Sequence, residues 1–394
     1  MLERTTEAIA GLEAIADDPQ GYAQRWKDEH DRKVIGSFPM NFPAELVHAA
    51  GMLPVVVQES REAITEGRNL MFEFYCGYTR SLADQAAKGQ LDVFDGFLFV
   101  DHCIQLLGAA DGVRSRLDGR PMLYAQLVPS MDEPWTGEQV REQVGDMREQ
   151  LEAIAGRPIA DDDLAASIAL FNRNRALLRE IHALRRGGRA PLTASQMQAL
   201  VKSSMVMDKA RHTEVLEAIR DDLVDAAGAA PERIRVHLSG HFCQAPQPAL
   251  LDAIEECGAV VVDDDLYHGF RYISTDVAAE GDPFAALAAW YQDRNVTVPC
   301  PTRVQRDVDW DDYLVDALAA SGAEAVIVLM AKFCEPHMLY YPELRKALDA
   351  RAVPHLLVET EHEGLPLEAF RTRVETLLER VRRDRDLVPA GAPA

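Results

Sequence analysis

Residues 94–128, FDGFLFVDHCIQLLGAADGVRSRLDGRPMLYAQLV, decide the fold of this chain. The apolar run that ends at Val100 predicts a buried strand, residues 104–117 predict a helix, and residues 121–128 predict a second strand. A strand, a helix and a strand in this order form two parallel neighbours joined by a crossover. The stretch therefore predicts an α/β fold built on a parallel sheet, with helices on both of its faces.

The same alternation continues in both directions along the chain. Upstream, residues 34–57 predict a strand, a loop, a short helix and a strand, and residues 76–89 predict a helix that ends at Gly89. Downstream, strands alternate with helices again. The strands are expected at 234–240, 259–266, 323–330 and 353–359, and the helices at 248–258, 310–322, 342–352 and 367–383.

Strand signals are missing between these two blocks. From Thr136 to Gly228 the apolar residues recur with the period of a helix, so this part is expected to be all helical. We therefore predict two Rossmann-like parallel-sheet lobes joined by a helical segment. The expected boundaries are an N-terminal α/β lobe at 1–135, a helical segment at 136–228 and a C-terminal α/β lobe at 229–394.

The composition excludes several classes of protein. The 41 basic and 64 acidic side chains give a net charge of −23, which argues against binding to nucleic acid or to an anionic membrane surface. Because the protein as a whole repels negative charge, an anionic ligand would bind only in a pocket with local positive charge. No apolar run approaches the roughly 18 residues that span a membrane, and the N-terminus carries no secretory signal pattern. We expect a cytoplasmic protein.

Three of the six cysteines stand at the end of a predicted strand or at the start of a predicted helix. Cys103 and Cys334 directly follow predicted strands, and Cys76 follows an apolar stretch. The carboxyl edge of a parallel sheet is where ligands bind, and a helix N-terminus favours thiolate over thiol. Since the chain contains no C-x-x-C pair, zinc ribbons and closely spaced cluster motifs are excluded. Three thiolates drawn from two lobes suit zinc, or a four-iron cluster with one iron left open.

The same pattern has a plain structural alternative. Free cysteine is often just a small buried residue, and any one of the three taken alone fits that role. Cys257, inside a predicted helix, is interpreted as a packing residue. Cys243 follows a strand and Cys300 lies in a proline-flanked loop near the same edge, so neither is excluded as a ligand. Spacing alone leaves five candidates, which are Cys76, Cys103, Cys243, Cys300 and Cys334.

Four longer segments resemble a known family. They are KVIGSFPMNFPAELVHAAGMLPVVV (33–57), CGYTRSLADQAAKGQLDVFDGFLFVDHC (76–103), SGHFCQAPQPALLDAIEECGAVVVDDDLYHGFRYI (239–273) and KFCEPHMLYYPELRKALDARAVPHLLVETE (332–361). Together they resemble the 2-hydroxyacyl-CoA dehydratase and benzoyl-CoA reductase family, in order and over nearly the whole chain. The third segment is most similar to the smaller of the two cluster-binding subunits of the ATP-dependent benzoyl-CoA reductases.

The resemblance implies a [4Fe–4S] cluster held by three cysteines, whose motif positions correspond to Cys76, Cys103 and Cys334. It also implies low-potential one-electron transfer to an aromatic acyl-CoA, giving a cyclic dienoyl-CoA, in anaerobic aromatic degradation. The implied partners are a homologous second cluster-binding subunit and ATP-hydrolysing activator subunits that carry an iron–sulfur cluster of their own. This chain lacks G-x-x-x-x-G-K-[ST], so it is not itself a P-loop ATPase.

Three alternatives stay open on the sequence. The same cysteines would serve a subunit of an (R)-2-hydroxyacyl-CoA dehydratase, in which a radical reaction removes water. A two-lobed electron-relay subunit would hold the cluster without catalysis. A zinc-stabilised α/β protein would hold no iron at all.

Other side chains near the strand ends are candidates to assist the acyl group or the cluster. An imidazole in such a place also serves to cap a helix or to satisfy a backbone group, so each has a structural alternative. The run Asp263–Asp265 is interpreted first as solvated loop acids and a helix cap. The candidates are His102, His241 and Arg271, followed by His337, Tyr272 and Lys332, the last to offset the negative charge of a cluster.

Overall fold

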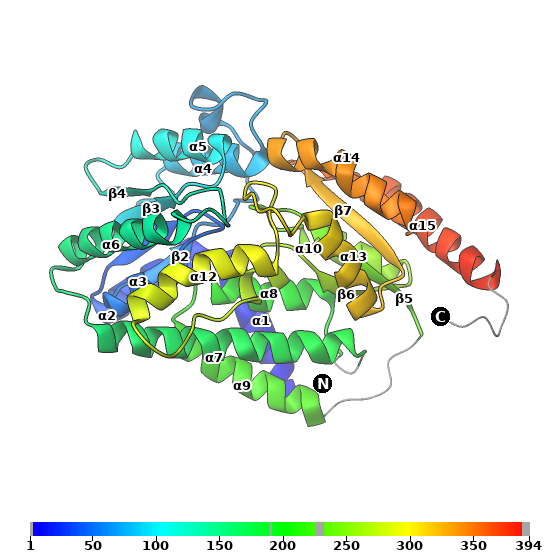
Figure 1. Ribbon diagram of the computed structural model, residues 1–394, viewed down its shortest axis with the longest axis horizontal. Coiled ribbons are helices and arrows are strands. Elements are labelled where there is room, and N and C mark those ends of the chain that lie inside the picture. The colour runs from blue at the N-terminus through cyan, green and yellow to red at the C-terminus, as the bar shows by residue number, and fades with distance from the viewer. Residues whose placement is uncertain (1–2, 189–190, 226–231, 388–394) are drawn as a thin grey trace.

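A computed structural model describes residues 3–188, 191–225 and 232–387. Its described residues contain two four-stranded sheets, which lie side by side and in which all paired strands run parallel (Figure 1). The predicted α/β class with two parallel-sheet lobes is confirmed. The first sheet has the order β2-β1-β3-β4 and consists of β1 (Val34–Ser37), β2 (Leu53–Val56), β3 (Gly96–Val100) and β4 (Met122–Ala125). The second has the order β6-β5-β7-β8 and consists of β5 (Ile234–Gly240), β6 (Ala259–Asp264), β7 (Ala325–Ala331) and β8 (His355–Thr360).

Helices surround both sheets. The helices up to the end of the first lobe are α1 (Glu3–Asp17), α2 (Pro19–His30), α3 (Ala44–Ala49), the 3₁₀ turn η1 (Glu66–Asn69), α4 (Gly77–Ala87) and α5 (Ile104–Arg114). The middle of the chain forms α6 (Thr136–Ala155), α7 (Asp161–Arg186), α8 (Ala194–Ser204) and α9 (Lys209–Asp225). The second lobe carries α10 (Pro248–Glu256), α11 (Phe270–Ile273), α12 (Pro283–Thr297), α13 (Trp310–Ser321), α14 (Glu335–Ala350) and α15 (Leu367–Leu387). None of the described helices combines enough length with enough apolar character to cross a membrane.

The central strands are buried along their whole length. All five residues of β3 and all seven of β7 are buried, because helices cover both faces of each sheet. This is why these strands appear in the sequence as continuous apolar runs rather than as alternating ones. The strand predicted at 121–128 is shorter than expected, since β4 ends at Ala125.

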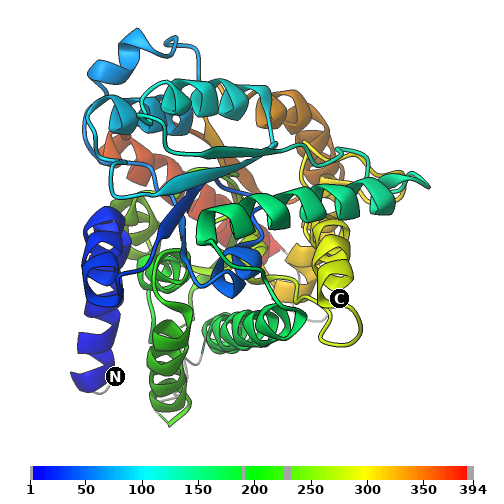
Figure 2. The same ribbon diagram turned by 90° about the vertical axis from the view of Figure 1, so that its left-hand side faces the viewer.

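The middle helices connect the two lobes. The long helix α7 packs against α3 in the first lobe and against β6 and α11 in the second. The N-terminal helix α1 packs on α8 and α9, and Figure 2 shows it in blue beside these green helices. The described part of residues 136–228 is helical, as expected. The boundaries at 135 and 228 stay predictions.

One predicted helix starts earlier than its sequence suggested. The expected start was Pro342, because proline favours the first turn of a helix. The helix α14 instead begins at Glu335, directly after Cys334, with Pro336 in its first turn and Pro342 inside it. The earlier start matters for the site, because it places the N-terminus of α14 at Cys334.

Candidate functional site

Three of the candidate cysteines occupy the same position in three different helices. Cys76, Cys103 and Cys334 are the N-cap residues of α4, α5 and α14, and none of the three side chains makes the capping hydrogen bond. The sequence predicts a helix start at Cys76 and Cys103, whereas for Cys334 it predicts only the end of a strand. The positive end of each helix dipole therefore lies at a sulfur atom. The Cys76 sulfur also lies 3.5 Å from the hydroxyl of Thr79.

The structure brings these three thiols together at one cavity, although they come from both lobes. This cysteine cavity is lined by residues that follow β3, β5 and β7, so the carboxyl ends of both sheets face it. The strand order reverses between β1 and β3 and between β5 and β7, and such switch points are where open parallel sheets bind ligands. The empty space is about 500 Å³, including the open solvent at its mouth. Its lining includes Cys76, Cys103, Cys243, Cys334, His102, His241 and His337.

Gln105 connects the loops that carry the cysteines. Its side-chain oxygen accepts a hydrogen bond of 2.8 Å from the backbone amide of Cys76, and its side-chain nitrogen donates one of 2.8 Å to the carbonyl of Phe333. Gln105 itself follows Cys103 by two residues. The side-chain amide of Gln105 is therefore hydrogen-bonded to the segments that carry Cys76 and Cys334, and it lies on the helix that Cys103 begins. No sequence pattern pointed to Gln105 as a residue of the site.

In the absence of a ligand the cysteines are held as thiols. Burial and, to a smaller extent, the neighbouring Cys76 raise the pKa of the Cys103 thiol to about 12. Burial also raises the pKa of Cys76, and it raises the pKa of Cys334 well above its usual range. A metal bound to such a group displaces the proton, so binding of a cluster would release protons here.

The three histidines of the cavity are buried and uncharged. Burial lowers the pKa of His241 to about 3, and burial helped by His241 and Arg271 lowers the pKa of His337 to about 3. The hydroxyl of Thr360 lies 2.6 Å from Nε2 of His241, whereas Nδ1 of His241 and both ring nitrogens of His337 have no partner among the described residues. Such unsatisfied nitrogens point to a group that is bound at this place in the working protein.

Three buried arginines act electrostatically on His102. Burial and the charges of Arg303, Arg271 and Arg294 hold the pKa of His102 well below its usual value. The arginines are 7%, 2% and 4% exposed, and they donate hydrogen bonds to backbone carbonyls. No carboxylate of the described residues lies within ion-pair distance of them, and each keeps one guanidinium nitrogen without a partner. Buried charges are stable only when they are compensated. None of the three arginines lines the cysteine cavity, so they act on its lining through their charge and not by contact.

The cavity offers thiols, which are the donors that iron–sulfur clusters require. Within the described ranges, no group of three or more His, Cys, Asp or Glu side chains is placed so that it could hold one metal ion. The cysteines of a four-iron cluster each bind a different iron, so they stand farther apart than the ligands of one ion. The thiol donors, the buried positive charges and the unsatisfied nitrogens suit an anionic cluster of this kind.

The other candidates lie elsewhere or have structural roles. Arg271 donates to the carbonyls of Asp265, Val298 and Pro299, so it positions the loop after α12 and does not line the cavity. Lys332 is half-exposed and pairs with Glu361 at 2.7 Å, away from the cysteines.

The acidic run at Asp263–Asp265 is not solvated, which corrects the first interpretation. Asp263 and Asp265 are buried, because helices cover the end of β6. Asp265 accepts hydrogen bonds from Ser239, from the backbone of Gly240 and from the indole of Trp310. Asp264 caps α11 through the amide of Phe270. Tyr272 is half-buried against the ring of Tyr267 and lies outside the cavity lining.

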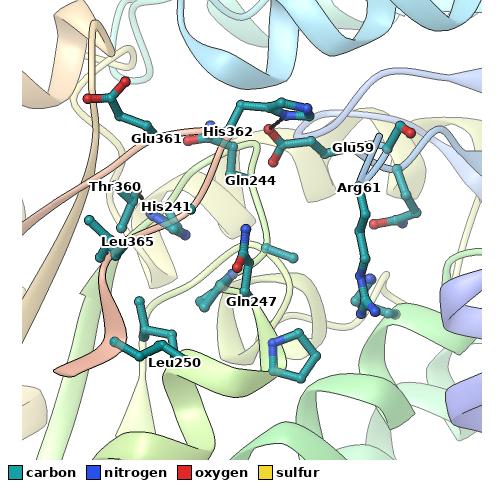
Figure 3. Close-up of a pocket in the computed structure, with 18 residues that line it drawn as sticks. Glu59, Arg61, His241, Gln244, Gln247, Leu250, Thr360, Glu361, His362 and Leu365 are labelled. Atoms are coloured by element: carbon teal, nitrogen blue, oxygen red, sulfur yellow. Dashed lines mark hydrogen bonds and ion pairs between the residues drawn. The ribbon is translucent and has the colours of Figure 1, made fainter. Parts of the chain in front are cut away.

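A second, polar cavity adjoins the cysteine cavity, and the two share His241 and Gln244 (Figure 3). Its walls also come from both lobes, and its empty space is about 760 Å³, open solvent included. His362, which follows β8, lies 2.8 Å from the Glu59 carboxylate and 2.7 Å from the Glu62 carbonyl. The two lobes are thus connected by polar contacts beside the cysteines.

The sequence comparisons identify the family of this chain. Residues 39–381 match the family described as the 2-hydroxyglutaryl-CoA dehydratase D-component. The chain is 26% identical to a benzoyl-CoA reductase subunit of Thauera aromatica, over 96% of this chain and 99% of that protein. It is 25% identical to the (R)-phenyllactyl-CoA dehydratase beta subunit of Clostridium sporogenes, over 93% and 96%, and 25% identical to the (R)-2-hydroxyglutaryl-CoA dehydratase beta subunit of Acidaminococcus fermentans, over 94% and 98%. The chain therefore belongs to the 2-hydroxyglutaryl-CoA dehydratase D-component family.

Proposed function

We propose that this chain is the iron–sulfur subunit of an ATP-dependent benzoyl-CoA reductase. Cys76, Cys103 and Cys334 would hold a [4Fe–4S] cluster. The observation that carries the proposal is that these thiols, from both lobes and from three helix N-termini, line one cavity. Such a cluster, when bound, supplies single electrons at very low potential, as reduction of an aromatic acyl-CoA to a cyclic dienoyl-CoA requires.

The chain's own residues would prepare the cavity for this chemistry. Gln105 holds the loops of Cys76 and Cys334 at a fixed separation. Burial keeps the imidazoles of His102, His241 and His337 neutral, and the unsatisfied ring nitrogens of His241 and His337 would make hydrogen bonds to a bound group. Phe242 and Leu106, which also line the cavity, help to exclude water.

The partners proposed are a homologous second cluster-binding subunit and ATP-hydrolysing activator subunits that carry a cluster. The relatives above are named as subunits, which supports a hetero-oligomer. We propose that the second subunit binds at a surface which we name the apolar rim. It consists of exposed side chains next to the three cysteines in the sequence, namely Phe72, Phe74, Ile104, Met338 and Leu339. A whole aromatic side chain has a surface of ~150–250 Å², so the exposed fractions of these five side chains add up to an apolar area on the order of 500 Å². Apolar patches of this size mark interaction sites.

A dehydratase subunit is the alternative function. The identity to two dehydratase beta subunits is 25%, against 26% for the reductase subunit, so identity scarcely separates the two reactions. The same cysteines would serve both. The difference lies in turnover: the dehydratase eliminates water from an (R)-2-hydroxyacyl-CoA with no net reduction. A non-catalytic electron-relay subunit is the second alternative.

The test is the iron and acid-labile sulfide content of anaerobically purified protein, with absorption and EPR spectra. We expect about four irons per chain in the wild type, and loss of the cluster in Cys103→Ala. Cys257→Ala is the matched control, because Cys257 ends α10 outside the cysteine cavity. Iron-free wild-type protein from anaerobic cells would overturn the proposal. With the cluster present, benzoyl-CoA and a 2-hydroxyacyl-CoA assayed beside the two partners separate the reductase from the dehydratase.

A further inference from the structure

Three buried arginines of the second lobe carry positive charge that no acidic side chain offsets. Arg271 lies on α11, Arg294 on α12 and Arg303 in the loop after α12. Among the described residues no carboxylate pairs with any of them, and each keeps one guanidinium nitrogen without a partner. Asp265 gives Arg271 only its backbone carbonyl, because its carboxylate accepts from three other donors. Burying charge in this way is costly, so the arrangement calls for a functional reason.

Neutral groups hold the three guanidinium groups in place. Each donates to backbone carbonyls, and each lies over an aromatic ring. The distances to the ring centres are 5.2 Å from Arg271 to Phe242, 5.2 Å from Arg294 to Trp290 and 5.6 Å from Arg303 to Tyr291. Carbonyl dipoles and aromatic faces attract a positive charge but do not cancel it. The net charge of the three arginines therefore remains.

Two of the arginines stand directly behind the lining of the cysteine cavity. Arg303 donates a 2.6 Å hydrogen bond to the carbonyl of Asp101, two residues before Cys103. Arg271 lies over the ring of Phe242, which itself lines the cavity. The positive charge is thus placed on both lobes' sides of the cavity, although no arginine reaches into it.

The effect of these charges is visible at two imidazoles of the lining. Burial is the main reason why the pKa values of His102 and His337 are low. The arginines add to it, all three at His102 and Arg271 at His337. A potential that disfavours positive charge at these rings favours negative charge at the same place.

We infer that Arg271, Arg294 and Arg303 raise the reduction potential of the bound cluster, so that it accepts the single electron which the activator subunit delivers. The inference rests on the proposed function, since it needs the cluster. Reduction by one electron makes the cluster more negative by one charge, and no bond forms or breaks. Buried positive charge stabilises the reduced form more than the oxidised form. The arginines act across the cavity wall and are therefore positioning residues, not catalytic ones.

A redox titration followed by EPR measures the potential in anaerobically purified protein. Arg303→Gln removes the charge but keeps a donor for the Asp101 carbonyl, whereas Arg303→Lys keeps the charge. We expect reduction to become at least about tenfold less favourable in Arg303→Gln, which is a potential ~59 mV lower, and Arg303→Lys to stay near the wild type. Arg157→Gln is the control, because Arg157 also donates to backbone carbonyls but its side chain is 47% exposed and water screens its charge.

Two outcomes of this titration would overturn the inference. Either Arg303→Gln keeps the potential of the wild type, or Arg303→Lys shifts as far as Arg303→Gln, which would mean that packing and not charge is responsible.

The salt dependence of the wild-type potential is a second test that needs no variant. The chain has a net charge of −23, and salt screens exposed charges far more than buried ones. A potential set by the buried arginines should change the reduction equilibrium by less than about tenfold between about 0.01 M and about 1 M salt. A larger change would show that surface charge sets the potential and would overturn the inference, also where Arg303→Gln assembles no cluster. If the wild type holds a cluster and fails these tests, only this inference falls, whereas a wild type without a cluster refutes the proposed function as well.

Discussion

The side-chain amide of Gln105 in the first lobe donates a 2.8 Å hydrogen bond to the carbonyl of Phe333 in the second. Phe333 has a φ of +66°, which a bulky residue rarely adopts. The hydrogen bond therefore holds a strained residue directly before Cys334. Since the same amide accepts from Cys76, one side chain joins the cysteine loops of the two lobes, beside the second connection that His362 makes to Glu59.

Gln105→Leu should lower the free energy of unfolding by about 2–4 kcal/mol, because it leaves a buried amide and a buried carbonyl without partners. Urea unfolding followed by circular dichroism measures the loss. Gln198→Leu is the control, because the Gln198 side chain is equally buried but its nitrogen has no partner among the described residues. Its cost should stay below about 1 kcal/mol. Equal losses in the two variants would contradict a bridging role.

Gly240→Ala should destabilise the protein by at least about 3 kcal/mol or prevent folding, since the new Cβ meets backbone and the φ is unfavourable. The contacts are 2.3 Å to the Leu329 carbonyl and 2.6 Å to the His337 ring. Gly145→Ala, in the interior of α6 with no atom within 4 Å of the new Cβ, should stabilise by about 0.5–1 kcal/mol. Thermal unfolding of the two variants and the wild type measures both changes in stability. A Gly240→Ala protein that melts like the wild type would show that the loop is not pressed onto β7.

The contact between His362 and Glu59 should make stability depend on pH. Burial lowers the pKa of His362, but hydrogen bonds to Glu59 and to the Glu62 carbonyl raise it by more, so the pKa lies above its ordinary value. The imidazolium is therefore favoured in the folded state. Its contribution is fully present below the unfolded pKa of about 6.5 and is lost as the pH rises through the higher folded pKa.

His362→Gln should therefore cost about 2 kcal/mol at pH 6 and progressively less at higher pH. Unfolding in urea at a series of pH values measures the difference from the wild type. His355→Gln is the control, because that imidazole contacts the carbonyl of Val353 within the second lobe. If the difference in unfolding free energy between His362→Gln and the wild type stayed constant with pH, the folded state would not favour the imidazolium form of His362.

Leu339→Glu should weaken binding of the second subunit at least about tenfold, because it places a charge in the centre of an apolar contact. Leu339 is 81% exposed, so the fold itself should be unaffected within about 0.5 kcal/mol. Val224→Glu, on α9 at 50% exposure, serves as the control outside the apolar rim. Sedimentation of the mixed subunits gives the affinities. Unchanged binding of Leu339→Glu would move the interface away from the cysteines.

Much of this fold is determined by local sequence. Continuous apolar runs predicted β3 and β7, because strands buried on both faces need apolar side chains at every position. The same local signals placed Cys103 and Cys334 after strands, and Cys76 and Cys103 at helix starts. The error at α14 is also local, since Pro336 and Pro342 both suit a first turn and the sequence does not rank them.

The composition of the site was decided by tertiary structure alone. Cys243 and Cys300 follow similar signals, yet only Cys243 lines the cavity. The role of Gln105 depends on Phe333, more than two hundred residues away, and the buried arginines become significant only once no carboxylate is found beside them. Sequence periodicity determines which residues form strands and helices, because it reports neighbours along the chain. Only the packing of the two lobes decides which of their side chains meet, because those contacts join residues that are remote in sequence.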